Sequence, residues 1–271
     1  MKFNLKWPNL FFLFLQLAFV NSAVSLSAAQ EPLFRGHAHN DYYHKRPLLD
    51  ALDQGFCSVE ADVFLQKGEL LVAHTVFEIR KERTLSSLYL DPLFERIRKK
   101  GFVHASDDHF LLLLDFKSRG SQCLERLNQL LAPHRDLLSR LEKGVLVPGK
   151  LTVVISGNRP AGEIVKADSR LVFLDGRLGD PKSWGPEISP LVSESWNTHF
   201  RYRGFGQMKS EEREKLEKMV AQVHRQKKRI RFWALPDREK GWAQAYESGV
   251  DLINTDKLEQ LRRFLQAKRE K

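Results

Sequence analysis

Two carboxylates, Glu60 and Asp62, stand two positions apart inside the apolar run 57–64. Side chains two positions apart on a β-strand point to the same face, so this pair would lie close together. Like charges at short range repel each other unless a proton or a cation lies between them. Val59 and Val63 beside them are typical of a buried strand rather than of a solvent-facing edge. The spacing therefore predicts a site for a hard divalent cation with oxygen ligands.

Two further apolar runs end in side chains that suit the same site. His74 closes one run, and Asp115 and Lys117 stand two positions apart at the end of another. Asp115 can complete a three-carboxylate cation site with Glu60 and Asp62. Lys117 can pair with these carboxylates or with a substrate phosphate. A histidine placed like His74 is either a hydrogen-bonded structural residue or a group that exchanges protons near neutral pH.

A dense polar segment follows the first short apolar segment, residues 32–34. It covers residues 35–41 and reads Arg-Gly-His-Ala-His-Asn-Asp. If residues 32–34 form the first strand, a site at the ends of the strands would begin in this segment. We expect His39 to hydrogen-bond within the loop.

The alternation of apolar and amphipathic segments predicts the strands and helices that must position these residues. Short apolar runs alternate with longer amphipathic stretches over about 240 residues, which predicts an α/β fold with a (β/α)8 TIM barrel. The apolar runs cover residues 57–64, 69–73, 110–116, 151–155, 171–174, 191–194, 230–234 and 250–253. The helix-like stretches cover residues 123–131, 135–142, 211–228 and 238–247. Most runs are continuous, as in strands buried on both faces of a parallel sheet, and the first strand is not followed by the GxGxxG of a doubly wound fold.

The first 29 residues are typical of a secretory signal peptide. Lys2 and Lys6 precede an apolar run over residues 10–20, and small residues follow it. We expect cleavage after this segment and export, either to a periplasm or out of the cell. An uncleaved anchor is the alternative. The remainder, residues 30–271, is expected to form a single barrel domain.

Composition excludes several classes of protein and leaves the partner open. With 42% hydrophobic and 29% charged residues, the chain is neither disordered, nor collagen-like, nor a polytopic membrane protein. The net charge of +10 suits a phosphorylated substrate or peripheral contact with an anionic membrane, but also solubility alone. The basic stretch 209–231 is interleaved with glutamates, so no nucleic-acid partner is expected. Cys57 and Cys123 can form at most one disulfide.

The order of these motifs resembles the glycerophosphodiester phosphodiesterase and phospholipase-C-like superfamily, including its spider-venom sphingomyelinase D branch. The order runs from Gly-His, through Glu-x-Asp-Val and a His after a glycine turn, to Asp-x-Lys. The opening His-Ala-His-Asn-Asp-Tyr with Ser-Val-Glu-Ala-Asp-Val is closest to a branch typified by a fungal "altered inheritance of mitochondria" protein. The similarity is strongest over residues 34–117. It recurs at Trp233 and at residues 249–256, Gly-Val-Asp-Leu-Ile-Asn-Thr-Asp.

The resemblance implies a TIM barrel that cleaves a glycerophosphodiester or phospholipid-type substrate, by hydrolysis or through a cyclic phosphate. It also implies two histidines as general acid and base around one Mg²⁺ or Ca²⁺ ion. The residues concerned are His37 and His74 for proton transfer, Glu60, Asp62 and Asp115 for the metal, and Lys117 for the phosphate. Trp233 and Asn254, at the ends of late strands, are expected to line the pocket. Arg35-Gly36 precedes the first histidine, and the third metal ligand is the shorter Asp115. Both departures favour the sphingomyelinase D geometry.

Two other readings of the same residues stay open. His37 and His39 would face the same way on a strand and can bind zinc, as in amidohydrolase-type barrels. That reading needs further histidines closing the middle strands, and only His199 lies near such a position. The other is a non-catalytic binder of anionic lipid or polysaccharide with an aromatic groove. Its aromatic residues would be Trp196, Tyr202, Phe205, Trp233 and Trp242.

Overall fold

The computed structural model describes residues 31–104 and 109–269. The predicted signal peptide, residues 1–29, lies outside these residues. Within the described part of the chain, no helix has both the length and the apolar character needed to cross a bilayer.

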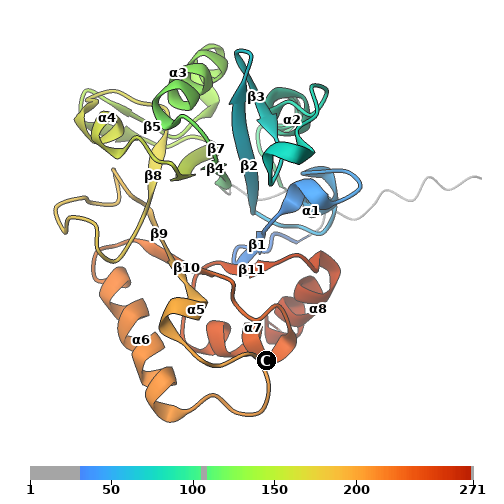
Figure 1. Ribbon diagram of the computed structural model, residues 1–271, viewed down its shortest axis with the longest axis vertical. Helices are drawn as coiled ribbons and strands as arrows, with labels where there is room; N and C mark the ends of the chain where they lie inside the picture. Colours follow the sequence, from blue (N-terminus) through green and yellow to red (C-terminus); the bar gives the residue numbers. More distant parts are fainter. Residues whose placement is uncertain (1–30, 105–108, 270–271) are drawn as a thin grey trace, which may run out of the picture.

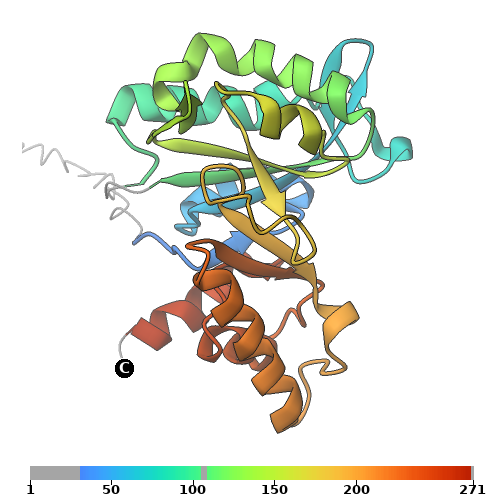
Figure 2. The ribbon, with the colours of Figure 1, turned by 90° about the vertical axis from the view of Figure 1, so that its left-hand side faces the viewer.

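Eight parallel strands form a nearly closed barrel with helices outside it (Figures 1 and 2). Their order around the barrel is β10-β9-β8-β7-β4-β2-β1-β11, and an isolated parallel bridge between Arg231 and Leu252 links the two ends. The strands are β1 (Gly36–Ala38), β2 (Ser58–Gln66), β4 (Phe110–Phe116), β7 (Leu151–Gly157), β8 (Phe173–Gly176), β9 (Leu191–Ser195), β10 (Arg229–Trp233) and β11 (Ile253–Thr255). The predicted (β/α)8 TIM barrel is therefore confirmed.

The helices cover the outside of the barrel with their apolar faces inward. α3, for example, buries Cys123, Leu124, Leu127 and Leu131 at helical spacing. The helices are α1 (Leu49–Asp53), α2 (Asp91–Lys100), α3 (Gly120–Leu131), α4 (Ala161–Lys166), α5 (Trp196–His199), α6 (Ser210–His224), α7 (Glu239–Glu247) and α8 (Leu258–Arg269). Shorter helical turns are η1 (Asp41–Tyr43), η2 (Val76–Glu78), η3 (Ser86–Leu90) and η4 (Ala132–Leu137).

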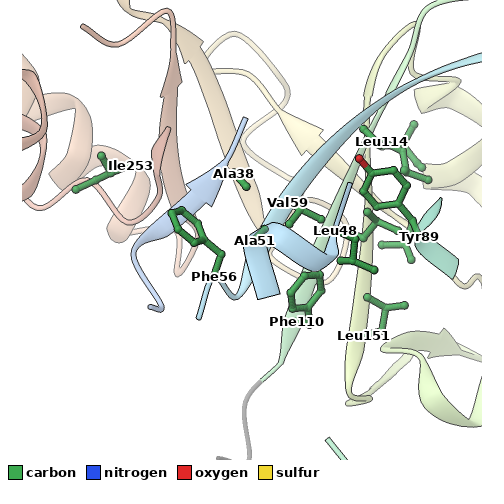
Figure 3. Close-up of a cluster of buried hydrophobic side chains, with 14 of the residues drawn as sticks. Ala38, Leu48, Ala51, Phe56, Val59, Tyr89, Phe110, Leu114, Leu151 and Ile253 are labelled. Carbon is green, nitrogen blue, oxygen red and sulfur yellow. The ribbon is translucent and has the colours of Figure 1, made fainter. Parts of the chain in front are cut away.

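The barrel contains two separate apolar regions. Outward-facing strand residues such as Ala38, Val59, Leu114 and Ile253 pack in the main core between the sheet and the helices (Figure 3). A smaller cluster fills the lower interior of the barrel. Its members are Leu111, Leu113, Val154, Phe173, Leu191 and Leu252. Polar inward positions lie at the C-terminal ends of the strands and, on β2, also at the depth of this cluster, because Glu60 is in register with Leu113.

Two predicted elements are hairpins instead of barrel strands or helices. β3 (Glu69–Val72) lies in one of the apolar runs that predict the barrel strands. It pairs antiparallel with the end of β2. The helix expected over residues 135–142 is wrong: η4 is followed by β5 (Arg140–Glu142), which pairs antiparallel with β6 (Val145–Val147). Both hairpins turn through a Lys-Gly pair in which both residues have positive φ, at residues 67–68 and 143–144. Two successive positive-φ residues form the type I′ turn that suits a two-residue hairpin.

The first strand also differs from the prediction. It covers residues 36–38 instead of 32–34, where Leu33 makes only an isolated bridge with Phe56. The residues Gly36–Ala38 of this segment are thus the strand itself, and the site begins just after its end, at His39. Cys57 and Cys123, both buried, are not joined by a disulfide.

The aspartate that follows this strand has a structural role. Asp41 is fully buried, and its Oδ2 accepts hydrogen bonds from the backbone N–H of Leu48 and from the hydroxyl of Tyr89. Leu48 has a φ of 63°, an unfavourable value for a branched residue, and this bond helps to hold it there. Burial raises the pKa of Asp41 to about 6 despite both hydrogen bonds. The Asp41 side chain therefore stabilises the conformation of the segment between β1 and α1, which begins with His39.

Candidate active site

Inward-facing polar residues stand level with one another on neighbouring strands. Asp62 on β2 pairs in register with Asp115 on β4, and Asp115 pairs with Ser156 on β7. The register of β7 and β8 places Asp175 level with Ser156. Glu60 lies two residues before Asp62, one inward step deeper. The two-residue period of the strands thus turns separate sequence motifs into one polar layer at the barrel mouth.

The three predicted metal ligands lie together. One oxygen from each of Glu60, Asp62 and Asp115 lies within 4.8 Å of the other two. Glu60 and Asp62 are 5% and 2% exposed. Burial and the charge of Glu60 raise the pKa of Asp62, although Lys117 lowers it. Three carboxylate oxygens this close to one another fit a hard cation bound by oxygen atoms.

Two basic side chains compensate part of this negative charge. Lys117 Nζ lies 3.0 Å from Asp62 Oδ2 and 2.8 Å from Asp115 Oδ2. Arg231, from β10, donates to the buried carboxylate of Glu60 in a short ion pair. Burial alone would raise the pKa of Glu60, but the charge of Arg231 and a hydrogen bond with His37 hold it well below its usual range.

Two imidazoles line the cavity above the carboxylates. His74 Nδ1 lies 2.9 Å from Asp62 Oδ2 and 2.9 Å from the hydroxyl of Tyr42. His39 Nδ1 lies 2.9 Å from Asp256 Oδ1. Burial alone would lower the pKa of His39, but the hydrogen bond to Asp256, together with nearby negative charge, raises it. In the described part of the chain, neither histidine has a hydrogen-bond partner at Nε2.

His37, the other histidine predicted to transfer protons, lies beneath the cavity. It is fully buried and is not among the residues that line the cavity. Its Nδ1 lies 2.7 Å from Ser58 Oγ, and its Nε2 lies 3.1 Å from Glu60 Oε2 and 2.7 Å from Arg231 Nη1. Burial lowers its pKa to about 4, so the ring is neutral near pH 7. The resemblance implied proton transfer by His37, but the histidine that reaches the cavity is His39, just after the end of β1 at Ala38.

Trp233 and Asn254, both predicted to line the pocket from the ends of late strands, differ in position. Trp233 lines the cavity and is 44% exposed. Asn254 is 4% exposed and does not line the cavity. It pairs in register with His37, which places it in the deeper layer of the barrel. Its amide atoms have no hydrogen-bond partner among the described residues.

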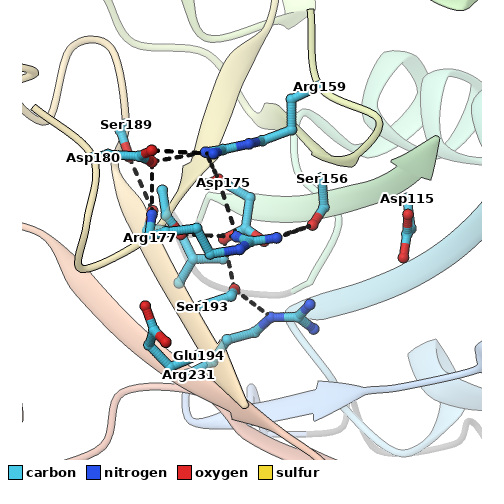
Figure 4. A network of polar contacts seen from close by, with 12 residues as sticks. Asp115, Ser156, Arg159, Asp175, Arg177, Asp180, Ser189, Ser193, Glu194 and Arg231 are labelled. Atoms are coloured by element: carbon cyan, nitrogen blue, oxygen red, sulfur yellow. Dashed lines mark hydrogen bonds and ion pairs between the residues drawn. The ribbon is translucent and has the colours of Figure 1, made fainter. Parts of the chain in front are cut away.

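Two arginines in the site were not predicted, Arg177 and Arg231 (Figure 4). The positions of both guanidinium groups depend on contacts, direct or through Ser193, with Asp175, which is fully buried on β8. Asp175 Oδ2 lies 2.9 Å from Arg177 Nη1. Asp175 Oδ1 accepts a hydrogen bond of 2.6 Å from the Ser193 hydroxyl. The same hydroxyl accepts a hydrogen bond of 2.6 Å from Arg231 Nε. Ser156 also donates to Asp175 and accepts from Arg177. Arg231 could have been found by the criterion that found Glu60, a charged inward position in an apolar strand.

The cavity that these residues line has a volume of about 390 Å³. Its lining residues are His39, Asn40, Glu60, Asp62, His74, Asp115, Lys117, Ser156, Gly157, Arg177, Arg231 and Trp233. It opens at the C-terminal ends of the strands, where TIM-barrel enzymes carry their active sites.

Solved structures of phosphodiesterases share this barrel. A glycerophosphodiester phosphodiesterase from Parabacteroides distasonis aligns with 89% of this chain and 100% of its own, with a TM-score of 0.53 and 14% identity. A phosphodiesterase from Oleispira antarctica, solved with its product sn-glycerol-3-phosphate, aligns with 86% of this chain and 96% of its own, with a TM-score of 0.51 and 12% identity. These structures therefore share the TIM-barrel fold of this chain.

Sequence comparison identifies the family. Residues 28–175 match the AIM6-like phosphodiesterase domain. "Altered inheritance of mitochondria protein 6" of Eremothecium gossypii is 32% identical over 282 residues, covering 90% of this chain and 72% of that protein. A homologue from Arthroderma benhamiae is 30% identical over 256 residues, covering 81% and 80%. The chain belongs to the AIM6-like phosphodiesterase domain family and is a phosphodiesterase, which confirms the resemblance found in its motifs.

The ion pair of Arg231 with Glu60 gives a test of this electrostatic arrangement. The Arg231→Leu variant leaves a buried carboxylate without its partner, so its free energy of unfolding in EDTA should fall by about 3–5 kcal/mol. Urea unfolding measures this loss. Adding Glu60→Gln should restore part of it, because the unpaired charge is removed. Arg238→Leu, at an exposed arginine, should change stability by about 0.5 kcal/mol or less. An equally small change for Arg231→Leu would contradict the arrangement.

Proposed function

We propose that this chain is a metal-dependent phosphodiesterase acting on a glycerophosphodiester or phospholipid-type substrate. The observation that carries the proposal is the composition of one cavity at the barrel mouth. Three carboxylates, two imidazoles and three cationic side chains line a space of about 390 Å³. Cleavage of a phosphodiester needs these three kinds of group, to hold a cation, to exchange protons and to neutralise phosphoryl oxygens.

Glu60, Asp62 and Asp115 would hold the cation. Their donor atoms are all carboxylate oxygens, which favour Mg²⁺ or Ca²⁺. A divalent cation there supplies charge neutralisation at the phosphoryl group and lowers the pKa of a coordinated hydroxyl. The zinc alternative with His37 and His39 has less support. Both ring nitrogens of His37 already have partners, and neither histidine joins the one cluster of potential metal ligands found in residues 31–104 and 109–269.

His39 and His74 are the proposed general acid and base. A carboxylate orients each ring at Nδ1, Asp256 for His39 and Asp62 for His74, so that Nε2 is left to take up or deliver a proton. Such a carboxylate also stabilises the protonated ring. His37 has no exposed surface from which to reach a substrate, and we propose that it supports Glu60 instead.

The cationic side chains would bind the phosphoryl oxygens. Lys117 lies beside Asp62 and Asp115, on the β2 side of the carboxylate cluster. Arg177 lies on the β8 side, held by Asp175 and Ser156. An oxygen-rich anion bound between them would be contacted from both sides, with Trp233 as an apolar wall. The attacking group is then water, giving hydrolysis, or a neighbouring substrate hydroxyl, giving a cyclic phosphate.

The two histidines near the N-terminal strand give the sharpest test. His39→Ala should lower kcat for bis-p-nitrophenyl phosphate or glycerophosphocholine by about 10²–10⁴-fold, the usual contribution of a general acid or base. Its melting temperature should stay near that of the parent chain, because the side chain lies at the cavity surface. His37→Ala should instead lower the melting temperature, since it leaves a buried cavity and removes the partner of Ser58. A near-parent rate for His39→Ala, with a stable but inactive His37→Ala, would reverse the assignment.

Removal of the cation tests the carboxylate site. EDTA should reduce phosphodiester cleavage to background, and Mg²⁺ or Ca²⁺ should restore it, because the ligands are all oxygen atoms. Asp115→Asn should raise the cation concentration needed for half-maximal rate. Asp53→Asn, at an exposed carboxylate on α1, should leave that concentration unchanged. Full activity in EDTA, or activity that depends on zinc retained through purification, would contradict the proposal.

We also propose that the chain is exported through its N-terminal segment, on the support of the basic and apolar composition of residues 1–29. Expression of the full chain in a secreting host should yield exported protein with an intact mass that begins near Gln30. Recovery of the uncut chain from membranes would show that the segment is a retained anchor. Recovery from the cytosol alone would contradict export.

A further inference from the structure

Exposed apolar side chains lie on segments that follow the C-terminal ends of barrel strands, the end at which the active-site cavity opens. Phe77 is 95% exposed and Val76 is 57% exposed on η2, just after His74. Phe205 is 69% exposed on the segment between α5 and α6, and Trp233 is 44% exposed at the end of β10. Each of these segments follows the C-terminal end of a barrel strand or of the β2–β3 hairpin. In Figure 2 the teal hairpin and the orange α5 segment both lie on the right-hand side of the barrel.

Hydrogen bonds to the Glu78 side chain stabilise the turn that carries Phe77. The Glu78 side chain accepts hydrogen bonds from the backbone N–H groups of His74, at 3.1 Å, and Thr75, at 3.2 Å. It also accepts one of 3.2 Å from the hydroxyl of Tyr43. Thr75 and Glu78 together form a capping box. Phe77, next to the exposed Val76, is therefore held out into solvent by its neighbours.

Positive charge gathers beside Phe205 on the other side of the mouth. Residues 201–209 include Arg201, Arg203 and Lys209 and no acidic residue. The guanidinium of Arg238 lies 4.0 Å from the centre of the Phe205 ring. All four cations are exposed, and none forms an ion pair with a carboxylate in the described part of the chain. Arg203 donates to the backbone oxygens of Phe200 and Tyr202. Glu212 accepts a hydrogen bond from the backbone N–H of Arg201, so the charge is unpaired but has one acidic neighbour in contact.

We propose that this rim docks the cavity mouth onto the surface of a bilayer that contains anionic phospholipids. The mouth rim comprises Val76, Phe77, Phe205 and Trp233 with Arg201, Arg203, Lys209 and Arg238. Aromatic side chains favour the depth of the lipid headgroups, and each cation near an anionic leaflet adds attraction. The apolar residues stand apart around a polar opening, which suits separate insertion into lipid better than the continuous apolar centre of a protein interface.

Docking of this kind would bring a lipid-borne phosphodiester to the cavity, because Trp233 belongs both to the rim and to the cavity lining. This inference rests on the proposed function only for its substrate. Binding to the bilayer is a separate property and can be measured without turnover.

The test is co-sedimentation of the exported chain, which begins near Gln30, in EDTA, with vesicles of phosphatidylcholine alone or mixed with phosphatidylserine. Binding should be stronger to the mixed vesicles and should weaken as salt is added. Phe77→Ser combined with Phe205→Ser should weaken binding by roughly tenfold or more, the order expected when buried phenyl surface is lost. Arg203→Gln with Lys209→Gln should remove most of the preference for phosphatidylserine.

The β5–β6 hairpin supplies a matched control. Val145 and Leu146 are 64% and 47% exposed, but their hairpin leads into the start of β7, at the opposite end of the barrel. Val145→Ser with Leu146→Ser should leave vesicle binding unchanged. The Phe77 and Phe205 variant should cleave a soluble phosphodiester at the parent rate, which shows that its cavity is intact.

The possible outcomes separate the two proposals. Failure of the parent chain to bind mixed vesicles overturns the docking proposal and leaves a protein partner as the occupant of the rim. An equal loss of binding in the β5–β6 control overturns the assigned surface. Vesicle binding that follows the rim variants, in a chain that cleaves no phosphodiester, supports docking and contradicts the proposed function.

Discussion

Mutual repulsion of three carboxylates inside a barrel is the constraint on which the site depends. Their oxygens lie within 4.8 Å of one another, and two of the three residues are almost wholly buried. The neighbouring groups are arranged to compensate this charge: Lys117 bridges two carboxylates, and Arg231 neutralises the third. Asp175 holds Arg231 in place through Ser193, so that the compensation reaches across the barrel from β2 to β8.

The barrel interior that carries this concentration of charge holds both apolar and polar side chains. Six apolar side chains fill part of the interior, and the polar inward positions extend from the mouth down to Glu60, His37 and Arg231. Asp115 and Lys117 near the mouth are only partly buried, whereas the almost fully desolvated Glu60 and Arg231 are paired directly with each other. Helix packing outside the sheet stabilises the strands independently of the site, so the mouth can carry groups that do not themselves favour folding.

Much of this organisation was predictable from local patterns. Continuous apolar runs indicated the barrel strands, and the spacing of Glu60 and Asp62 indicated their common orientation, because strand periodicity is a local property. The position of β1 was not predictable in this way, since a three-residue strand containing two small residues has little pattern of its own. His37 was preferred to His39 because its role was carried over from the Gly-His motif of the family that the sequence resembles, although the two differ by only one inward step. Arg177 escaped prediction because it follows the last residue of β8, and its place in the site depends on Asp175 and Ser156.

The β2–β3 hairpin has a consequence for how the site assembles during folding. Glu60, Asp62 and His74 all lie on this hairpin or directly after it, so contacts of short sequence separation can bring them together early. The contact between His39 and Asp256 spans 217 residues, and that between Glu60 and Arg231 spans 171. These bonds form only when the two ends of the barrel meet. We therefore expect one half of the site to take shape with a local hairpin, and the other half to be completed only by closure of the whole chain.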